Sequence, residues 1–196
     1  MSASEQAQQI ASALADAFRV GAAFDVMPQV RRYGDPTDKS TIDLLTCADS
    51  PQRGITSYGT IGLSGHARPN ATDLRVELVG AFSSALPGFA EVLANCAFNA
   101  INDGAPLRLG VVHGEAMGDL SPTLPHVMFF SPFLWGDAPE TLVLADRTVA
   151  WLMAVPISEV ERAYAQIEGA NALEELFARA DINILDPKRP SVLGRI

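Results

Sequence analysis

Apolar positions between Thr141 and Ala180 follow a pattern that predicts two strands and then two helices. Val149 to Ile157 is almost unbroken apolar sequence, which is typical of a strand covered on both faces in the middle of a sheet. A shorter apolar run, Leu142 to Leu144, precedes it across the two-residue connection Asp146-Arg147. We expect strands joined by so short a turn to pair antiparallel.

Two amphipathic helices are predicted after this central strand. Ser158 and Glu161 have the spacing of a capping box, in which each side chain hydrogen-bonds the other residue's backbone N–H. Gly169 suits the end of the first helix, and Asn171 is expected to cap the second. The second helix then carries an apolar stripe made of Leu173, Leu176, Phe177 and Ala180.

Two further helices are predicted in the first half of the chain. Ser2 and Glu5 have the capping-box spacing, and the apolar positions after them lie on one side of a helix over residues 4–20. A second amphipathic pattern begins after Leu86-Pro87 and ends at the turn-forming residues Asn102-Asp103-Gly104.

The remaining apolar runs are short and predict strands. They lie at residues 42–47, 55–63, 74–79, 107–112 and 126–130. Together they indicate an α+β fold for one domain spanning residues 1–196, with a central mixed, mostly antiparallel sheet of about six or seven strands flanked by helices.

Polar segments complete this prediction. Residues 31–40 are expected to form a loop with turn chemistry at Gly34-Asp35-Pro36. Arg75 and Glu77 alternate with apolar residues and are predicted to form a same-face ion pair on a solvated or helix-rimmed surface. Residues 181–196 are expected to be an extended tail, because Pro187 and Pro190 are incompatible with a helix interior.

The segment Ser131–Gly136 is too apolar for an ordinary surface loop. Two interpretations stand: the segment folds back over the core, or it presents an apolar patch to a partner. The core interpretation is favoured because large apolar side chains are usually buried.

Charge and composition narrow the function classes. The 196-residue chain has a net charge of −9 and a pI near 4.7, which argues against nucleic acids and anionic membranes as partners. No secretory signal and no apolar run of membrane-spanning length is visible, so a cytoplasmic protein is expected. Cys47 and Cys96 form neither a zinc-binding spacing nor a disulfide framework, and no metal or cofactor is predicted.

Candidate chemistry is confined to a few residues. The sequence lacks a phosphate-binding loop, a nucleophile elbow and an HExxH motif. A small hydrolase or ligand-binding protein would have to use His113, Glu115 and His126, and these side chains would then have to converge in one pocket. A small-molecule site under Ser131–Gly136 is a third hypothesis, and it requires a deep apolar cavity with converging polar groups.

The order and spacing of five segments resemble the Suppressor of fused-like domain family, in its compact bacterial type. The resemblance covers about residues 25 to 192 and implies a mixed α/β domain that binds protein and has no known chemistry. Animal relatives hold a transcription factor, partly by strand pairing, and bacterial members are similar to immunity proteins of polymorphic toxin systems. The segments are Ile55–Ser64 (ITSYGTIGLS), Leu74–Leu78 (LRVEL), His126–Phe133 (HVMFFSPF), Trp151–Ile157 (WLMAVPI) and Asp186–Val192 (DPKRPSV).

The resulting functional prediction is a non-enzymatic immunity protein that neutralises a cognate toxin by direct binding. A basic toxin domain would complement the acidic chain. The resemblance supplies no catalytic residues. Candidate contacts are therefore loop acids and apolar anchors: Asp35, Asp38, Asp49, Glu115, Asp119, Phe133 and Trp135.

Overall fold

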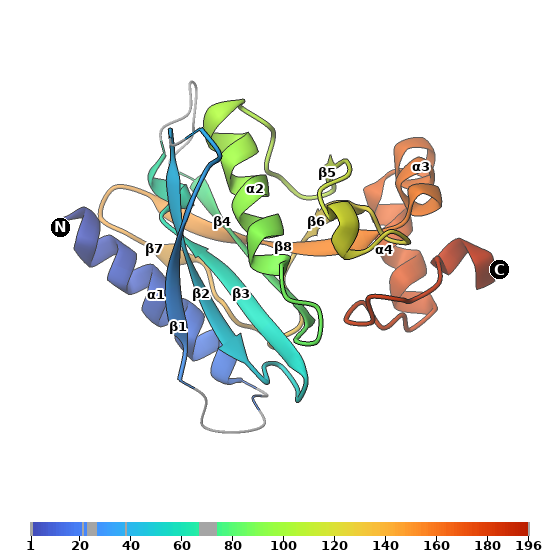
Figure 1. The fold of residues 1–196 in the computed structure, drawn as a ribbon, viewed down its shortest axis with the longest axis horizontal. Coiled ribbons are helices and arrows are strands. Elements are labelled where there is room, and N and C mark those ends of the chain that lie inside the picture. Colours follow the sequence, from blue (N-terminus) through green and yellow to red (C-terminus); the bar gives the residue numbers. More distant parts are fainter. Residues whose placement is uncertain (1, 21, 23–26, 38, 67–73, 196) are drawn as a thin grey trace.

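The computed structural model describes residues 2–20, 22, 27–37, 39–66 and 74–195, and these residues form a mixed eight-stranded sheet with helices on both faces (Figure 1). The strand order is β1-β2-β3-β4-β8-β6-β5, and β7 pairs with β8 beyond the end of β6. β4 and β8 run parallel, and the other strand pairs are antiparallel. The predicted α+β class with a mixed, mostly antiparallel sheet is confirmed.

The elements have the following bounds. The strands are β1 Gln29–Gly34, β2 Thr41–Ala48, β3 Ile55–Ile61, β4 Leu74–Ser83, β5 Val112–His113, β6 His126–Phe130, β7 Leu142–Val143 and β8 Thr148–Ile157. The α-helices are α1 Ala3–Arg19, α2 Phe89–Asn102, α3 Glu159–Glu168 and α4 Ala170–Arg179, and the 3-10 turns are η1 Leu63–Gly65, η2 Gly118–Leu120 and η3 Val192–Arg195.

β8 occupies the central position that its unbroken apolar sequence predicts. It pairs with β4 on one side and with β6 and β7 on the other. Because successive side chains of a strand point to opposite faces, β8 contributes to two separate cores. Leu152 and Ala154 pack on the face covered by α2, whereas Met153 and Val155 pack on the face covered by α1 and α4.

Local helix signals are confirmed at three of four positions. Ser2 and Ser158 both form complete capping boxes with Glu5 and Glu161, and α3 ends at Gly169. The prediction that Asn171 caps α4 is wrong, because α4 already begins at Ala170 and Asn171 lies within it. Gly169, at φ 95°, turns the chain directly from α3 into α4 without a longer connection.

Two strand predictions are corrected. Residues 29–34, expected to lie largely in a loop, form β1 at one edge of the sheet. The side chains of β1 are almost all exposed, so the strand lacks the apolar alternation that reveals a half-buried strand. Conversely, the strand predicted at residues 107–112 is reduced to β5 at Val112–His113.

Glu77 is buried rather than solvated, so the predicted surface ion pair with Arg75 is wrong. Its side chain is 0% exposed, and its carboxylate accepts hydrogen bonds from Thr60 Oγ1 and from the backbone N–H groups of Gly62, Leu63 and Ser64. Glu77 therefore holds η1 against β4. Removal from water disfavours the charge, and burial raises the pKa of Glu77 above its ordinary value.

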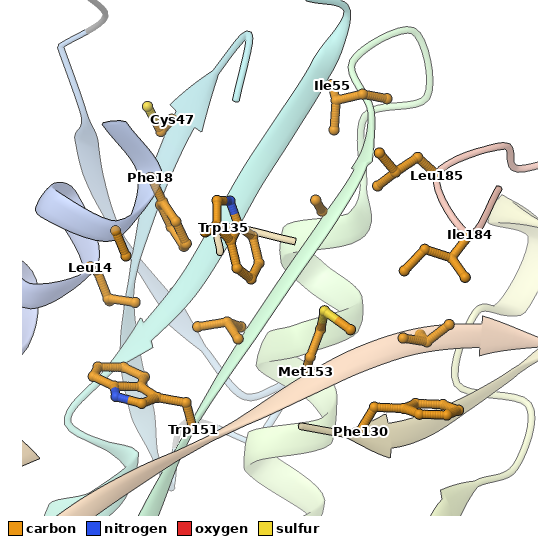
Figure 2. Close-up of a cluster of buried hydrophobic side chains, with 14 of the residues drawn as sticks. Leu14, Phe18, Cys47, Ile55, Phe130, Trp135, Trp151, Met153, Ile184 and Leu185 are labelled. Carbon is orange, nitrogen blue, oxygen red and sulfur yellow. The ribbon is translucent and has the colours of Figure 1, made fainter. Parts of the chain in front are cut away.

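The two cysteines lie in different cores. Cys47 packs with Phe18 and Trp135 on the α1 side of the sheet (Figure 2), whereas Cys96 lies in α2 on the opposite side. Both are free thiols. Burial in an apolar environment raises the pKa of Cys96 to about 12, which favours its neutral thiol form.

The tail after α4 packs against the core. Ile184, Leu185 and Val192 are buried in the core on the α1 and α4 side, and η3 ends the described tail. Among the helices in the described part of the chain, none combines the length and apolar composition needed to cross a bilayer.

Candidate functional site

The two histidines proposed for a hydrolytic or ligand-binding site point to opposite faces of the sheet. His113 pairs with Val127 in the β5–β6 ladder, and its ring lies edge-on against Phe129, 4.9 Å between centroids, on the α2 side. Its Nε2 lies 3.1 Å from the carbonyl oxygen of Pro106. His126 is one residue from Val127 and so faces the other side. The structure brings Glu115 Oε1 to 3.7 Å from His126 Nδ1, but it leaves His113 on the other face, so the three side chains do not converge in one pocket.

His126 joins three segments of the fold. Its Nδ1 accepts a hydrogen bond from the Glu115 backbone N–H at 3.0 Å, and its Nε2 lies 2.6 Å from Glu159 Oε2 at the start of α3. Hydrogen bonds from Arg162 and from His126 lower the pKa of Glu159 to about 2. No group of three or more His, Cys, Asp or Glu side chains within residues 2–66 and 74–195, as far as these are described, is arranged to hold a metal ion.

The predicted acidic contacts differ in accessibility. Glu115 and Asp119 are exposed on the segment between β5 and β6. Asp49 is half-buried, and its carboxylate accepts the Gly54 N–H at 2.7 Å within a turn. Asp38 lies outside the described residues. Asp35 is only 4% exposed, so its prediction as an exposed loop acid is wrong.

Asp35 organises the connection between β1 and β2. One carboxylate oxygen accepts hydrogen bonds from the backbone N–H and side-chain hydroxyl of Thr37, at 2.6 and 2.7 Å. The other accepts the Ser40 N–H at 2.8 Å and Asn102 Nδ2 at 3.0 Å, which ties the loop to α2. The Thr37 hydroxyl is the largest of the causes that hold the pKa of Asp35 well below its usual range.

Replacing Asp35 with asparagine should lower the urea midpoint of unfolding at neutral pH. An amide keeps the Thr37 contacts but presents a donor to the donors of Ser40 and Asn102. Because the native pKa is depressed, wild-type stability from this group is present above about pH 4 and is lost as the pH falls through the native value.

Urea unfolding at neutral and acidic pH tests the Asp35 prediction. The difference in urea midpoint between wild type and Asp35→Asn should become smaller below about pH 4. Asp103→Asn, at an exposed position, is the matched control and should leave the midpoint unchanged. A difference between wild type and Asp35→Asn that persists unchanged into acid would contradict the assigned role.

The segment Ser131–Gly136 combines both of its predicted behaviours. Trp135 is 1% exposed and packs against Phe18 at a tilt of 38°, with 4.9 Å between ring centroids (Figure 2). Its indole N–H donates to Ser57 Oγ at 2.9 Å. Its prediction as a surface anchor is therefore wrong. Phe133, two residues earlier, is 53% exposed and remains available to a partner.

Phe133 borders an apolar groove of about 300 Å³, which we call the α4 groove. It lies between α4, the start of the C-terminal tail and the ends of β6 and β8. Sequence patterns did not reveal it, because its walls come from four separate segments. The groove is lined by Phe130, Phe133, Val155, Glu174, Phe177, Ala178, Asp181, Ile182 and Ile184.

A second groove of about 470 Å³ lies over the part of β8 between its pairings with β6 and β7. Ser131 and Pro132 line one side of it, together with Leu109, which is 58% exposed. Neither groove joins His113 or His126 to a carboxylate. The geometry of both grooves suits apolar contact rather than acid–base chemistry.

Comparison with known proteins places the chain in a family. The model of the Suppressor of fused protein (SUFU) family matches residues 38–190. The chain is 43% identical over 176 residues to the immunity protein YqcF of Bacillus subtilis (strain 168), and the match covers 87% of this chain and 92% of that protein.

Solved structures share the fold at low sequence identity. A SUFU homologue from Neisseria gonorrhoeae has a TM-score of 0.75 at 16% identity, over 96% of this chain and 97% of that one. A chain of the Sufu–Fu complex has a TM-score of 0.68 at 12% identity, over 97% of this chain and 93% of that one. Drosophila Suppressor of Fused gives 0.65 at 12% identity, over 97% of this chain but 52% of that one. The family model over residues 38–190 and the 43% identity to YqcF show that the chain belongs to the Suppressor of fused protein family.

Proposed function

We propose that this chain is a non-enzymatic protein-binding domain that acts as an immunity protein and neutralises a toxin by direct binding. The observation that carries the proposal is the 43% identity to immunity protein YqcF, spread over 87% of this chain. A match of that extent covers nearly the whole length of both proteins, so we expect a shared mode of action.

The geometry of the described residues supports a role in binding through the protein surface. His113 packs in the core and contacts the Pro106 carbonyl, and His126 joins β6 to α3 through Glu159. Exposed apolar area is available at Phe133 and along the α4 groove. The net charge of −9 would attract a basic toxin domain, speed the encounter and oppose binding to acidic proteins.

Co-expression with the protein encoded by the neighbouring gene tests this proposal. Expressed alone, that protein should arrest growth, and expression of this chain should restore growth. The two proteins should then co-elute as one complex in size-exclusion chromatography. Continued arrest in cells that contain soluble chain would contradict the proposal.

Titration separates binding from enzymatic detoxification. If the chain acts by occupying the toxin, protection in vitro should end when toxin exceeds chain in molar amount. An enzyme that modifies or destroys the toxin would instead protect at a small molar fraction. Protection by far less than one chain per toxin would therefore overturn direct binding as the mechanism.

A further inference from the structure

We propose that the α4 groove receives an apolar side chain of the toxin, and that lysine or arginine residues next to that side chain pair with Glu174 and Asp181. This inference rests on the proposed function and assigns a surface to it. The occupant is a segment of a protein partner with one buried apolar anchor flanked by cations.

The interior of the groove is apolar and held in place from several sides. Phe130 of β6 and Phe177 of α4 stack with 5.9 Å between ring centroids and an interplanar angle of 17°. Val155 of β8 and Ile184 of the tail are buried beside them. A volume of about 300 Å³ lies at the lower limit for small-molecule pockets and suits one large side chain.

The opening of the groove remains apolar where it meets solvent. Phe133 is 53% exposed on one side, and Ala178 is exposed on α4. An exposed aromatic ring beside a preformed apolar pocket is the arrangement found at interface hot spots, where surrounding contacts exclude water from an anchor. Packing of the walls lowers the entropic cost of receiving such an anchor.

Two carboxylates flank the groove without a partner of their own. Glu174 and Asp181 line it roughly two helical turns apart, on α4 and just beyond its end. Within the described part of the chain, neither side chain makes a hydrogen bond or ion pair. Two cations of this region are engaged elsewhere, because Arg179 pairs with Glu175 and buried Arg189 pairs with Glu161.

The charge around the groove favours a basic partner protein over a second copy of this chain. Self-association through this face would bring the Glu174 and Asp181 carboxylates of both copies together on two chains that each carry a net charge of −9. Like charges placed opposite each other oppose association. A basic partner gains from the same carboxylates, and its apolar side chain fills the space between them.

Binding of the toxin to three variants tests the inference. Ala178→Trp fills the groove from an exposed position, Phe133→Ala removes the exposed ring, and the pair Glu174→Lys with Asp181→Lys reverses the flanking charge. Ala178→Trp and the charge reversal should each raise the Kd by about tenfold or more, as loss of a hot-spot contact does. The charge reversal should also reduce the dependence of Kd on salt.

Matched substitutions at the other end of the molecule provide controls. Asp16→Lys changes an exposed acid on α1, which lies far from α4 (Figure 1), and Val143→Ala truncates a side chain that is 76% exposed on β7. Both should keep the Kd within about twofold of wild type. Circular dichroism melts of all variants establish that each is folded; if Ala178→Trp is not, the surface variants at 133, 174 and 181 carry the test.

The outcomes distinguish this inference from the proposed function. A wild-type chain that does not bind the toxin contradicts the proposed function itself. A wild-type chain that binds tightly, with groove variants that bind equally well, overturns the groove assignment alone. Self-association of the wild-type chain that Ala178→Trp abolishes would show that a second copy occupies the groove, and would likewise overturn it.

Discussion

Replacing Arg189 with alanine should lower the free energy of unfolding by about 3 to 5 kcal/mol, because Glu161 is then left buried without its cation. Arg189 and Glu161 are 2% and 0% exposed at their side chains. Both guanidinium NH groups reach the carboxylate, at 2.7 and 2.9 Å, in a two-point contact. This is the most deeply buried ion pair among the described residues.

The pair fastens the C-terminal tail to the start of α3. Arg189 also donates to the carbonyl oxygen of Pro156 at 2.9 Å, and Glu161 accepts the backbone N–H groups of Ser158 and Val192. Burial works against the charge of Glu161, but the hydrogen bonds and charge of Arg189 outweigh it, so the pKa of Glu161 lies below its ordinary value. Losing Arg189 therefore removes both the cation and the anchor of the tail.

Urea unfolding followed by circular dichroism measures this effect. Arg179→Ala is the matched control, since Arg179 pairs with Glu175 on the exposed face of α4 and such pairs contribute at most about 0.5 kcal/mol. The double variant Arg189→Met with Glu161→Leu should be more stable than Arg189→Ala, because no buried charge is left alone. Equal losses for Arg189→Ala and Arg179→Ala would contradict the proposed role of the pair.

Patterns that depend on near neighbours in sequence predicted the fold well. The central strand at Val149–Ile157 is revealed by its own apolar run, and the capping boxes at Ser2 and Ser158 depend on residues three positions away. The edge strand β1 was not predicted, because its side chains are almost all exposed and show no apolar periodicity.

Charged residues show where such patterns fail. Glu77 and Arg189 look like surface residues in sequence, yet each is buried against groups supplied by other segments. Sequence periodicity predicts which face of a strand a residue occupies. It does not predict whether a distant turn supplies hydrogen-bond donors on that face. Asp35 is a similar case, since Asn102 of α2 completes its set of hydrogen bonds.

The α4 groove also depends on residues that are distant in sequence. Phe133 was identified from sequence as an apolar anchor and is exposed, but the α4 groove beside it combines residues from β6, β8, α4 and the tail. Glu174 reads as an ordinary polar position next to a buried stripe. Only the fold shows that Glu174 and Asp181 line the same groove.

Trp135→Ala should lower the free energy of unfolding by about 3 to 5 kcal/mol, whereas Phe133→Ala should lower it by about 1 kcal/mol or less. Trp135 fills the core between α1 and the sheet, where it contacts Phe18 (Figure 2). Its removal leaves a cavity and deprives Ser57 of the indole donor. Phe133 is half exposed, so its truncation leaves far less unfilled space.

These neighbouring aromatic residues separate stability from binding within one short segment. Urea unfolding of each variant gives the two free energies of unfolding, and titration with the proposed toxin partner gives the two dissociation constants. We expect Phe133→Ala to weaken binding while the fold stays intact, because its ring borders the α4 groove. Trp135→Ala should lower the fraction of molecules that are folded. The molecules that remain folded should bind with nearly wild-type affinity. Comparable losses of stability for both variants would mean that Phe133 is held by the core, and the groove would then lose its accessible aromatic wall.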